Sequence, residues 1–252
     1  MIILIASVVL AVLSFWDDRQ GLPIWIRLLA QGIAVVGGVL VLPDVGVFQG
    51  WLPLPVDRLL AAILWLWFIN LYNFMDGIDG IAAVETIFLG FGIALLAGSS
   101  LIGGYATAIS GAAFGFLFWN RPPAKIFLGD VGSVPLGYIL GYLLLLLATQ
   151  GSWAAALILP MYYLVDATVT LMIRLIDGQK IWLAHREHAY QRAVQRGLSH
   201  GAVTTRIALC NSVLVVLAGL TMQFTTFTKM TLVAAALGWC LVFWWRLRGR
   251  SR

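Results

Sequence analysis

Long runs of residues without a charged side chain constrain the fold of this sequence more than any other feature. Six such runs cover residues 28–43, 59–75, 86–120, 131–165, 207–228 and 230–245. Only 11% of the residues are charged, whereas an average soluble domain carries about 25%. Because hydrocarbon penalises charge and these runs have the length that a bilayer requires, we predict a polytopic membrane protein and exclude a soluble enzyme, a disordered chain and a disulfide-stapled secreted domain.

The apolar runs predict about nine transmembrane helices. A spanning helix needs about 20 residues, and the two longest runs are interrupted at Gly98-Ser99-Ser100 and at Gln150-Gly151-Ser152. Each is therefore predicted to form a helical hairpin, and the apolar start at residues 1–15 adds one more helix. Only helices and closed barrels can span a bilayer, and the runs lack the alternation of a barrel strand, so the predicted fold class is all-α.

The basic residues predict how the chain is threaded. Alternate crossings place five segments on one side: residues 16–27, 70–80, 120–130, 174–206 and 246–252. Of the sixteen Lys and Arg residues, only Arg58 and Lys229 fall on the other side, and Arg250 and Arg252 close the basic C-terminus. The positive-inside rule assigns the basic side to the cytoplasm. The net charge of +5 is thus a topology signal, and no nucleic-acid partner is expected.

Five aspartates gather in the first three of these segments. They are Asp17 and Asp18 in SFWDDRQG, Asp76 and Asp79 in NFMDGIDG, and Asp130 in KIFLGDVGS. Helix capping explains one acid at the start of a helix, but two adjacent aspartates repel each other and require a cation or a raised pKa. Mg²⁺ binds through a few carboxylates together with substrate phosphates. The sequence therefore predicts a magnesium site and a phosphate substrate on the cytoplasmic face.

The fourth segment, residues 174–206, holds all three histidines of the chain. No cysteine is near, so these histidines are weak zinc ligands. Arg186, with its planar fork, and His188 are instead candidates for binding a pyrophosphate or a lipid phosphate. A basic interfacial loop that rests on lipid headgroups is the alternative.

Two acids and two cysteines lie inside or beside the apolar runs. An acid in such a position is a functional hypothesis by default, which applies to Glu85 and Asp166, although no role for Asp166 follows from the sequence. Cys210 and Cys240 are predicted to be packed as small hydrophobic residues rather than joined in a disulfide or bound to metal.

The motifs FWDDRQG, NFMDGIDG, FLGDVGS and HREHAYQR, in this order and all on the predicted cytoplasmic side, carry a family resemblance. Together they resemble the polyprenyl-phosphate N-acetylhexosamine-1-phosphate transferase superfamily, glycosyltransferase family 4, whose membrane enzymes begin peptidoglycan, O-antigen, teichoic-acid and N-glycan lipid intermediates. The loop KIWLAHREHAYQRAVQRG looks closest to the bacterial branch that initiates the O-antigen of lipopolysaccharide or a related polysaccharide of cell-wall biogenesis. The peptidoglycan branch has consecutive histidines here, which this chain lacks.

The resemblance implies a catalytic set and a metal site. Asp130 would be a direct Mg²⁺ ligand, with Asp18 as a second ligand and Asp17 near the metal and the incoming lipid phosphate. Asp17 would act there as a base or would only position that phosphate. His188 best matches the functional histidine of the family and completes the catalytic set. Mn²⁺ is the alternative metal.

The resemblance also implies a substrate pocket. Seven residues would form it: Asn73, Asp76, Asp79, Asn120, Phe127, His185 and Arg186. Phe127 would stack on uracil and Asn120 would hydrogen-bond to the edge of the base, while Asn73 and the two aspartates would shape the nucleotide and pyrophosphate pocket. An ordinary membrane-interface anchor is the alternative for Phe127.

The implied reaction is the transfer of an N-acetylated sugar-1-phosphate from a UDP-sugar to undecaprenyl phosphate, with release of UMP. The sugar would be GlcNAc or a deoxyamino sugar such as FucNAc or QuiNAc. The expected location is the bacterial inner membrane with cytoplasmic catalytic loops, and a homodimer is left open. Two alternatives remain: a secondary transporter, because clustered acids and interrupted helices also mark ion pathways, and a catalytically inactive homologue.

The chain is expected to form one integral-membrane transferase domain, residues 1–252. Family members normally carry two further helices before the one that ends at the paired aspartates, with a cytoplasmic loop that helps to hold the nucleotide. Nothing in this sequence matches that loop. The resemblance therefore predicts that the chain lacks the two N-terminal helices and that the full-length protein has eleven.

Overall fold

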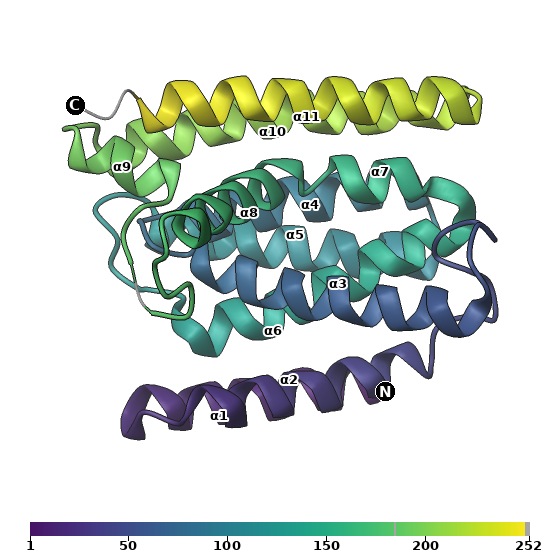
Figure 1. Ribbon diagram of the computed structural model, residues 1–252, viewed down its shortest axis with the longest axis horizontal. Helices are drawn as coiled ribbons and strands as arrows, with labels where there is room; N and C mark the ends of the chain where they lie inside the picture. The colour runs from purple at the N-terminus through teal and green to yellow at the C-terminus, as the bar shows by residue number, and fades with distance from the viewer. Residues whose placement is uncertain (184, 250–252) are drawn as a thin grey trace.

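The computed structural model describes residues 1–183 and 185–249, and the regular structure within them is entirely helical (Figure 1). The helices are α1 (Ile2–Gln20), α2 (Ile24–Val39), α3 (Leu54–Phe74), α4 (Ile81–Ala97), α5 (Leu101–Asn120), α6 (Gly129–Leu147), α7 (Trp153–Ile158), α8 (Met161–Ile176), α9 (Ala189–Gln195), α10 (His200–Leu220) and α11 (Thr226–Arg248). Arg250 and Arg252 lie outside the described residues. The all-α prediction is confirmed.

The apolar helices fit a protein that crosses a membrane several times. Five helical stretches are long and apolar enough to span: 54–74, 101–120, 129–158, 200–223 and 226–248. Helices α2 and α4 are apolar but shorter. The predicted reversal in the run 131–165 is present, because Gly151 adopts a φ of 90° inside the distorted turn Ala148–Ser152 and α7 then runs back beside α6 (Figure 1).

Two features of this region were not predicted. A second break at Leu159-Pro160 separates α7 from α8, since proline lacks the N–H that a continuous helix needs and its ring clashes with the preceding turn. The short helix α9 forms inside the histidine-containing segment. Both features help to place α8 and α9 near the candidate site.

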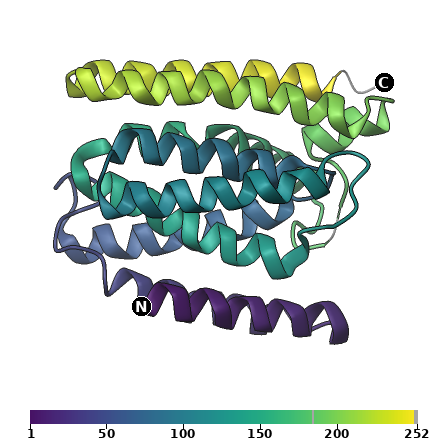
Figure 2. The same ribbon diagram turned by 180° about the vertical axis from the view of Figure 1, so that it is seen from behind.

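The helices form three layers. Helices α1 and α2 make one outer layer and α10 and α11 the other, with α3 to α8 between them, as both views show (Figures 1 and 2). The segments 21–23, 75–80, 121–128, 177–183 and 185–199, the last of which contains α9, gather at the left of Figure 1, together with the C-terminal end of α11. We call this the polar end. The four predicted catalytic segments therefore do share one end of the molecule.

Aromatic stacking and close glycine contacts join α2, α3 and α6. The Trp65 indole stacks on Tyr138 with ring centroids 4.7 Å apart, and the indole N–H donates to the Tyr138 carbonyl at 2.9 Å. The Tyr138 hydroxyl donates in turn to the Ala34 carbonyl of α2 at 2.9 Å. A Cβ atom at Gly38 or Gly141 would overlap Trp65, so glycine permits this close packing. These contacts fix the helices that line the candidate site.

A buried carboxylate stabilises the opposite end of the molecule. Asp57 is fully buried and accepts hydrogen bonds from the backbone N–H groups of Val47 and Phe48, each at 2.9 Å. An Asp57→Ala change orphans both donors, so we expect the free energy of unfolding to fall by about 3 kcal/mol. Thermal unfolding in detergent checks this against Asp44→Ala, which removes an exposed acid. Equal midpoints for the two variants would contradict the assignment.

Candidate active site

An arginine joins the carboxylates of two motifs at the polar end. Arg27 Nη1 lies 2.9 Å from Asp17 Oδ2 and 3.9 Å from Asp130 Oδ2. The turn after α1 makes this possible: Gly21 ends the helix with a φ of 67°, and the Leu22 N–H donates to Asp17 at 2.6 Å. The sequence did not identify Arg27 as a functional residue, because an arginine just before an apolar run was interpreted only as a marker of the cytoplasmic side.

The remaining carboxylates of this cluster repel one another. Burial, followed by the charges of Asp130 and Asp17, raises the pKa of Asp18 above its ordinary value. Burial and the charge of Asp130 raise the pKa of Asp76 to about 7. Four predicted residues, Asp17, Asp18, Asp76 and Asp130, thus face a shared electrostatic environment that a bound cation would relieve.

The carboxylate cluster fits a magnesium ion whose coordination is completed by a substrate. Within residues 1–183 and 185–249, no three His, Cys, Asp or Glu side chains form a ready-made metal cluster. Mg²⁺ does not need one, because it takes one or two carboxylates and fills its octahedron with phosphate oxygens and water. Asp18 and Asp130 are chemically suited to that role, and the metal remains a prediction.

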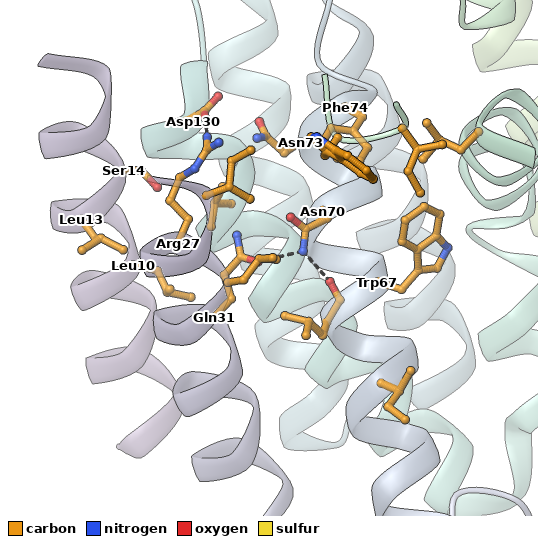
Figure 3. A pocket seen from close by; sticks show the side chains of 18 residues that line it. Leu10, Leu13, Ser14, Arg27, Gln31, Trp67, Asn70, Asn73, Phe74 and Asp130 are labelled. Atoms are coloured by element: carbon orange, nitrogen blue, oxygen red, sulfur yellow. Dashed lines mark hydrogen bonds and ion pairs between the residues drawn. The ribbon is translucent and has the colours of Figure 1, made fainter. Parts of the chain in front are cut away.

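Beneath this cluster lies a cavity of about 410 Å³ between α1, α2, α3 and α6 (Figure 3). Arg27, Asn73 and Asp130 form its polar rim. Further in, the Asn70 side-chain N–H donates to Gln31 Oε1 at 2.7 Å, and the other lining residues are mostly apolar. The cavity therefore has charged side chains at its opening and an apolar interior.

The cavity is open toward the side of the bundle. Its lining residues Ile24, Leu28 and Ile63 are 42%, 42% and 55% exposed, respectively, and Trp182 beside it is 63% exposed. These exposed apolar side chains leave the cavity open at the surface of the bundle.

Asn73 and Asp76 lie in the second motif, close to this rim. The Ser133 hydroxyl donates to Asn73 Oδ1 at 2.7 Å, which ties α3 to the first turns of α6. Because Asn73 lines the cavity and Asp130 acts electrostatically on Asp76, the structure brings these predicted substrate-binding residues together with the predicted metal ligand.

Asp79 and Asn120 connect the loops of the second and third motifs. Asn120 is only 4% exposed; its side chain accepts from the Gly80 N–H at 2.9 Å and donates to the Ile126 carbonyl at 2.8 Å. Asp79 accepts from the Ala124 N–H at 3.1 Å. Both residues therefore have a structural task, and their proposed contacts with a nucleotide stay predictions.

Phe127 lies at the surface of the third-motif loop and is 73% exposed. It precedes Leu128 and Gly129, and Gly129 has a positive φ of 61°. This exposure leaves the ring free to stack on a base or to anchor the loop in the membrane interface. Stacking on uracil stays a prediction.

The histidine-containing segment is fastened to the second motif. The Tyr190 hydroxyl donates to the Phe74 carbonyl at 2.9 Å, and a Cβ atom at Gly77 would overlap this hydroxyl. Phe74 itself lines the cavity. The glycine of NFMDGIDG thus permits the fourth motif to approach the second, so all four predicted segments reach the same region.

The predicted residues of the fourth motif differ in what they can offer a ligand. His188 is only 2% exposed. Burial, and then the neighbouring His188 and Arg174, lower the pKa of His185 to about 4. His185 is therefore neutral at pH 7 and can bind an anion only as a hydrogen-bonding group. Arg186 is exposed, so its guanidinium can reach a ligand at the surface.

Acidic partners hold the rest of this segment. Glu187 pairs with Arg174 and, at 3.1 Å, with Arg192. The buried Asp166 of α8 accepts the Ala189 N–H at 2.8 Å, although the sequence suggested no role for it. The only signal available in the sequence was an acid next to an apolar run.

Comparison with known proteins agrees with the motifs. The sequence model described as Glycosyl transferase family 4 matches residues 1–148. A "Probable undecaprenyl-phosphate N-acetylglucosaminyl 1-phosphate transferase" of Bacillus subtilis (strain 168) is 30% identical over 219 residues, which cover 79% of this chain and 59% of that protein.

Relatives from the peptidoglycan branch match as well. A "Phospho-N-acetylmuramoyl-pentapeptide-transferase" of Lactiplantibacillus plantarum is 31% identical over 214 residues, or 74% of this chain and 64% of that protein. The protein of the same name from Moorella thermoacetica is 41% identical over 95 residues, or 36% of this chain and 30% of that protein. The chain spans less than two thirds of the length of these relatives. By the matched family model, which covers more than half of its residues, the chain belongs to glycosyl transferase family 4.

Proposed function

We propose that this protein transfers an N-acetylated sugar-1-phosphate from a UDP-sugar to undecaprenyl phosphate and releases UMP. One observation carries the proposal: the cluster of Arg27, Asp17 and Asp130 lies at the mouth of a laterally open, mostly apolar cavity. A polyprenyl phosphate has the matching chemistry, with one anionic group at the end of a long hydrocarbon chain. The names of the relatives from Bacillus and Lactiplantibacillus support a transfer of this class.

The reaction joins two anions. An oxygen of the lipid phosphate attacks the β-phosphorus of the UDP-sugar, and the bond from that phosphorus to the bridging oxygen breaks, so that UMP leaves with the bridging oxygen. The second pKa of a phosphate monoester is about 6, so the lipid phosphate is mostly a dianion at pH 7. The chain therefore needs to position this nucleophile more than to deprotonate it.

The residues at the rim match these needs. Arg27 can donate to the lipid phosphate through its planar fork, and Asp17 holds the guanidinium at 2.9 Å. Asp17 thus acts as a positioning group rather than as a base. A Mg²⁺ ion bound by Asp130 and Asp18 would neutralise the pyrophosphate and stabilise the leaving UMP. Asn73 and Asp76, on the other wall, would contact the nucleotide side of the substrate.

The fourth motif supports a finer proposal for the reaction. We propose GlcNAc or a deoxyamino sugar as the group transferred, an O-antigen or a related polysaccharide as the product pathway, and the cytoplasmic face of a bacterial inner membrane as the place. The absence of consecutive histidines in HREHAYQR supports this choice over a muramoyl-pentapeptide substrate. A donor panel of UDP-N-acetyl-sugars, assayed for UMP release with undecaprenyl phosphate in detergent, tests it.

Removal of divalent metal is expected to abolish this activity. With EDTA in excess, UMP release should fall to background, because the carboxylate cluster and the pyrophosphate repel each other without a cation. Addition of Mg²⁺ in excess of EDTA should restore the rate, and Mn²⁺ should restore part of it. Full activity in EDTA would exclude a metal role for Asp18 and Asp130. A lack of UMP with every donor would favour the transport or inactive-homologue alternatives.

A further inference from the structure

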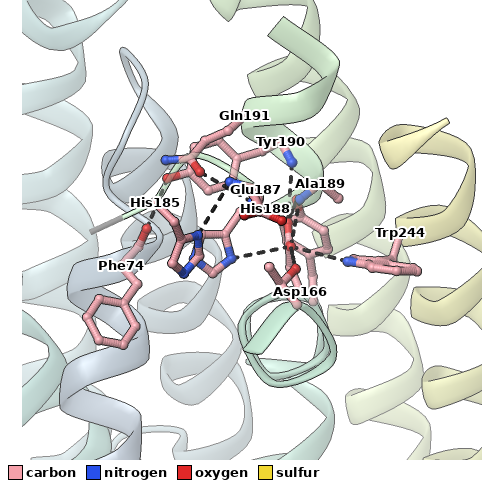
Figure 4. Close-up of polar contacts among 11 residues, drawn as sticks. Phe74, Asp166, His185, Glu187, His188, Ala189, Tyr190, Gln191 and Trp244 are labelled. Atoms are coloured by element: carbon pink, nitrogen blue, oxygen red, sulfur yellow. Dashed lines mark hydrogen bonds and ion pairs between the residues drawn. The ribbon is translucent and has the colours of Figure 1, made fainter. Parts of the chain in front are cut away.

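A buried carboxylate on α8 fixes the start of α9. Asp166 is fully buried. Its Oδ1 atom accepts hydrogen bonds from the Ala189 N–H at 2.8 Å and the Trp244 indole N–H at 3.2 Å. The hydroxyls of Thr170 and Tyr162 donate to the same carboxylate at 3.2 and 3.0 Å. These donors come from α8, α9 and α11 (Figure 4), so the carboxylate determines where the first turn of α9 lies.

His188, the residue before α9, faces the same carboxylate. Its Nδ1 atom lies 3.6 Å from Asp166 Oδ1, which is too long for a hydrogen bond. In the part of the chain that the structure describes, this buried nitrogen has no hydrogen-bond partner. A carboxylate can only accept, so a hydrogen bond between these two atoms would require the proton on Nδ1.

Neighbouring rings restrict the orientation of this imidazole. The Tyr190 ring stacks on His188 with centroids 5.8 Å apart and an interplanar angle of 13°, and the His185 ring lies 4.8 Å away. The backbone N–H of His188 donates to the Gln191 side chain at 3.3 Å. The ring is thus held by packing, and Asp166 provides the one charge directly opposite its Nδ1 atom among the described residues.

We propose that Asp166 is a positioning residue that sets the tautomer and orientation of His188 for the transfer reaction. The proposal rests on the proposed function, since it adds a residue to the same site. The gap of 3.6 Å closes to a hydrogen bond when the substrate binds, as is common for contacts that are long in a free enzyme. Asp166 thereby holds the His188 ring in one orientation and one tautomer, in the way that a buried carboxylate orients an imidazole elsewhere.

A double-mutant cycle separates positioning from a purely structural role. We expect Asp166→Asn to lower kcat of UMP release by about 10- to 100-fold, with a much smaller change in KM for the UDP-sugar. In a His188→Gln background, the same change should lower kcat by less than about threefold, because its target is already gone. A role confined to capping α9 would instead give the same loss in both backgrounds, and that result would overturn the proposal.

Tyr162→Phe is the matched control. It removes another donor to the Asp166 carboxylate at 3.0 Å but leaves the charge and His188 unchanged. We expect kcat within about threefold of the parent protein, because the carboxylate keeps its charge and its contacts with Ala189 and Trp244. A loss in Tyr162→Phe equal to that in Asp166→Asn would indicate general damage to the site and would contradict the positioning role.

A second readout does not depend on activity. The chain has three histidines, so selective ¹⁵N labelling gives a simple spectrum that single His→Gln changes assign. At a pH where the ring is neutral, His188 should carry its proton on Nδ1 in the parent protein and in Tyr162→Phe. In Asp166→Asn, the Nε2–H tautomer that free histidine prefers should appear.

The two readouts distinguish the failure of each claim. If the parent protein releases no UMP with any donor, the proposed function fails and the tautomer alone decides whether Asp166 orients His188. If UMP is released but His188 carries its proton on Nε2 in the parent protein, the proposed function stands and the positioning role is wrong. A tautomer unchanged by Asp166→Asn would also reject it.

Discussion

Replacement of Asp130 by asparagine is expected to lower kcat of UMP release by about 10³-fold, the scale on which loss of one strong electrostatic group slows an enzyme. Asp130 acts on three neighbouring side chains: it lies 3.9 Å from Arg27 and raises the pKa of both Asp18 and Asp76. Asparagine keeps the shape and removes the charge. Because the Asp130 side chain is 33% exposed, the fold should survive the change.

The measurement is UMP release with undecaprenyl phosphate and Mg²⁺, run beside thermal unfolding of the same preparations. Asp44→Asn is the matched control, because it makes the same chemical change at an exposed position in the connection between α2 and α3, which lies at the opposite end of the molecule. We expect the control to retain the parent rate. A rate for Asp130→Asn within about threefold of the parent would remove Asp130 from the metal site and from the reaction.

Arg27→Met should have the second largest effect. We expect kcat/KM for undecaprenyl phosphate to fall by about 100-fold, because a phosphate loses charge-assisted hydrogen bonds of about 1.5–3 kcal/mol each. The change also leaves Asp17 without its partner at 2.9 Å, which adds repulsion toward the incoming anion. KM for the UDP-sugar should change much less, since Arg27 faces the lipid side of the cavity beside Leu28 and Gln31.

Two further variants sharpen this test. Arg27→Lys keeps the charge but loses the planar fork, so it should recover part of the activity. Arg19→Met is the control, because the Arg19 guanidinium lies over the Phe15 ring, 4.4 Å from its centroid, and is exposed. Equal losses in Arg27→Met and Arg19→Met would show that the rate responds to basic charge in general, and the lipid-phosphate role of Arg27 would be wrong.

The sequence predicted the charged residues of the site, because a membrane protein tolerates charged side chains at few positions. In a chain with so few charged residues, carboxylates are expected only where helices leave the membrane. The alternation of the helices across the membrane then determines which helix ends lie on the same side. Asp17, Asp76 and Asp130 follow from that logic, and the structure brings them together. The breaks at Gly98 and Gly151 follow from the length of the runs and the weakness of glycine in a helix.

The contacts of individual side chains could not be predicted from the positions of the charged residues. Arg27 was missed because an arginine near the start of a membrane helix also fits the positive-inside rule. Only the turn at Gly21 shows that the Arg27 side chain lies against Asp17. Two of the donors to Asp166, Ala189 and Trp244, lie 23 and 78 residues away in the sequence, so no local pattern links them to this acid. The backbone contacts of Asn120 were equally hidden, since long-range contacts leave no local pattern.

The most direct test of the central claim follows the β-phosphorus of the donor. The protein is incubated with Mg²⁺, undecaprenyl phosphate and UDP-GlcNAc labelled with ³²P at the β-position, and the lipid is extracted into butanol. Because the β-phosphorus stays with the sugar when the bond to the bridging oxygen breaks, our account predicts label in the lipid in equal amount to the UMP released, and none with Asp130→Asn. Label that appears as free GlcNAc-1-phosphate, or that remains in the UDP-sugar throughout the donor panel, would contradict it.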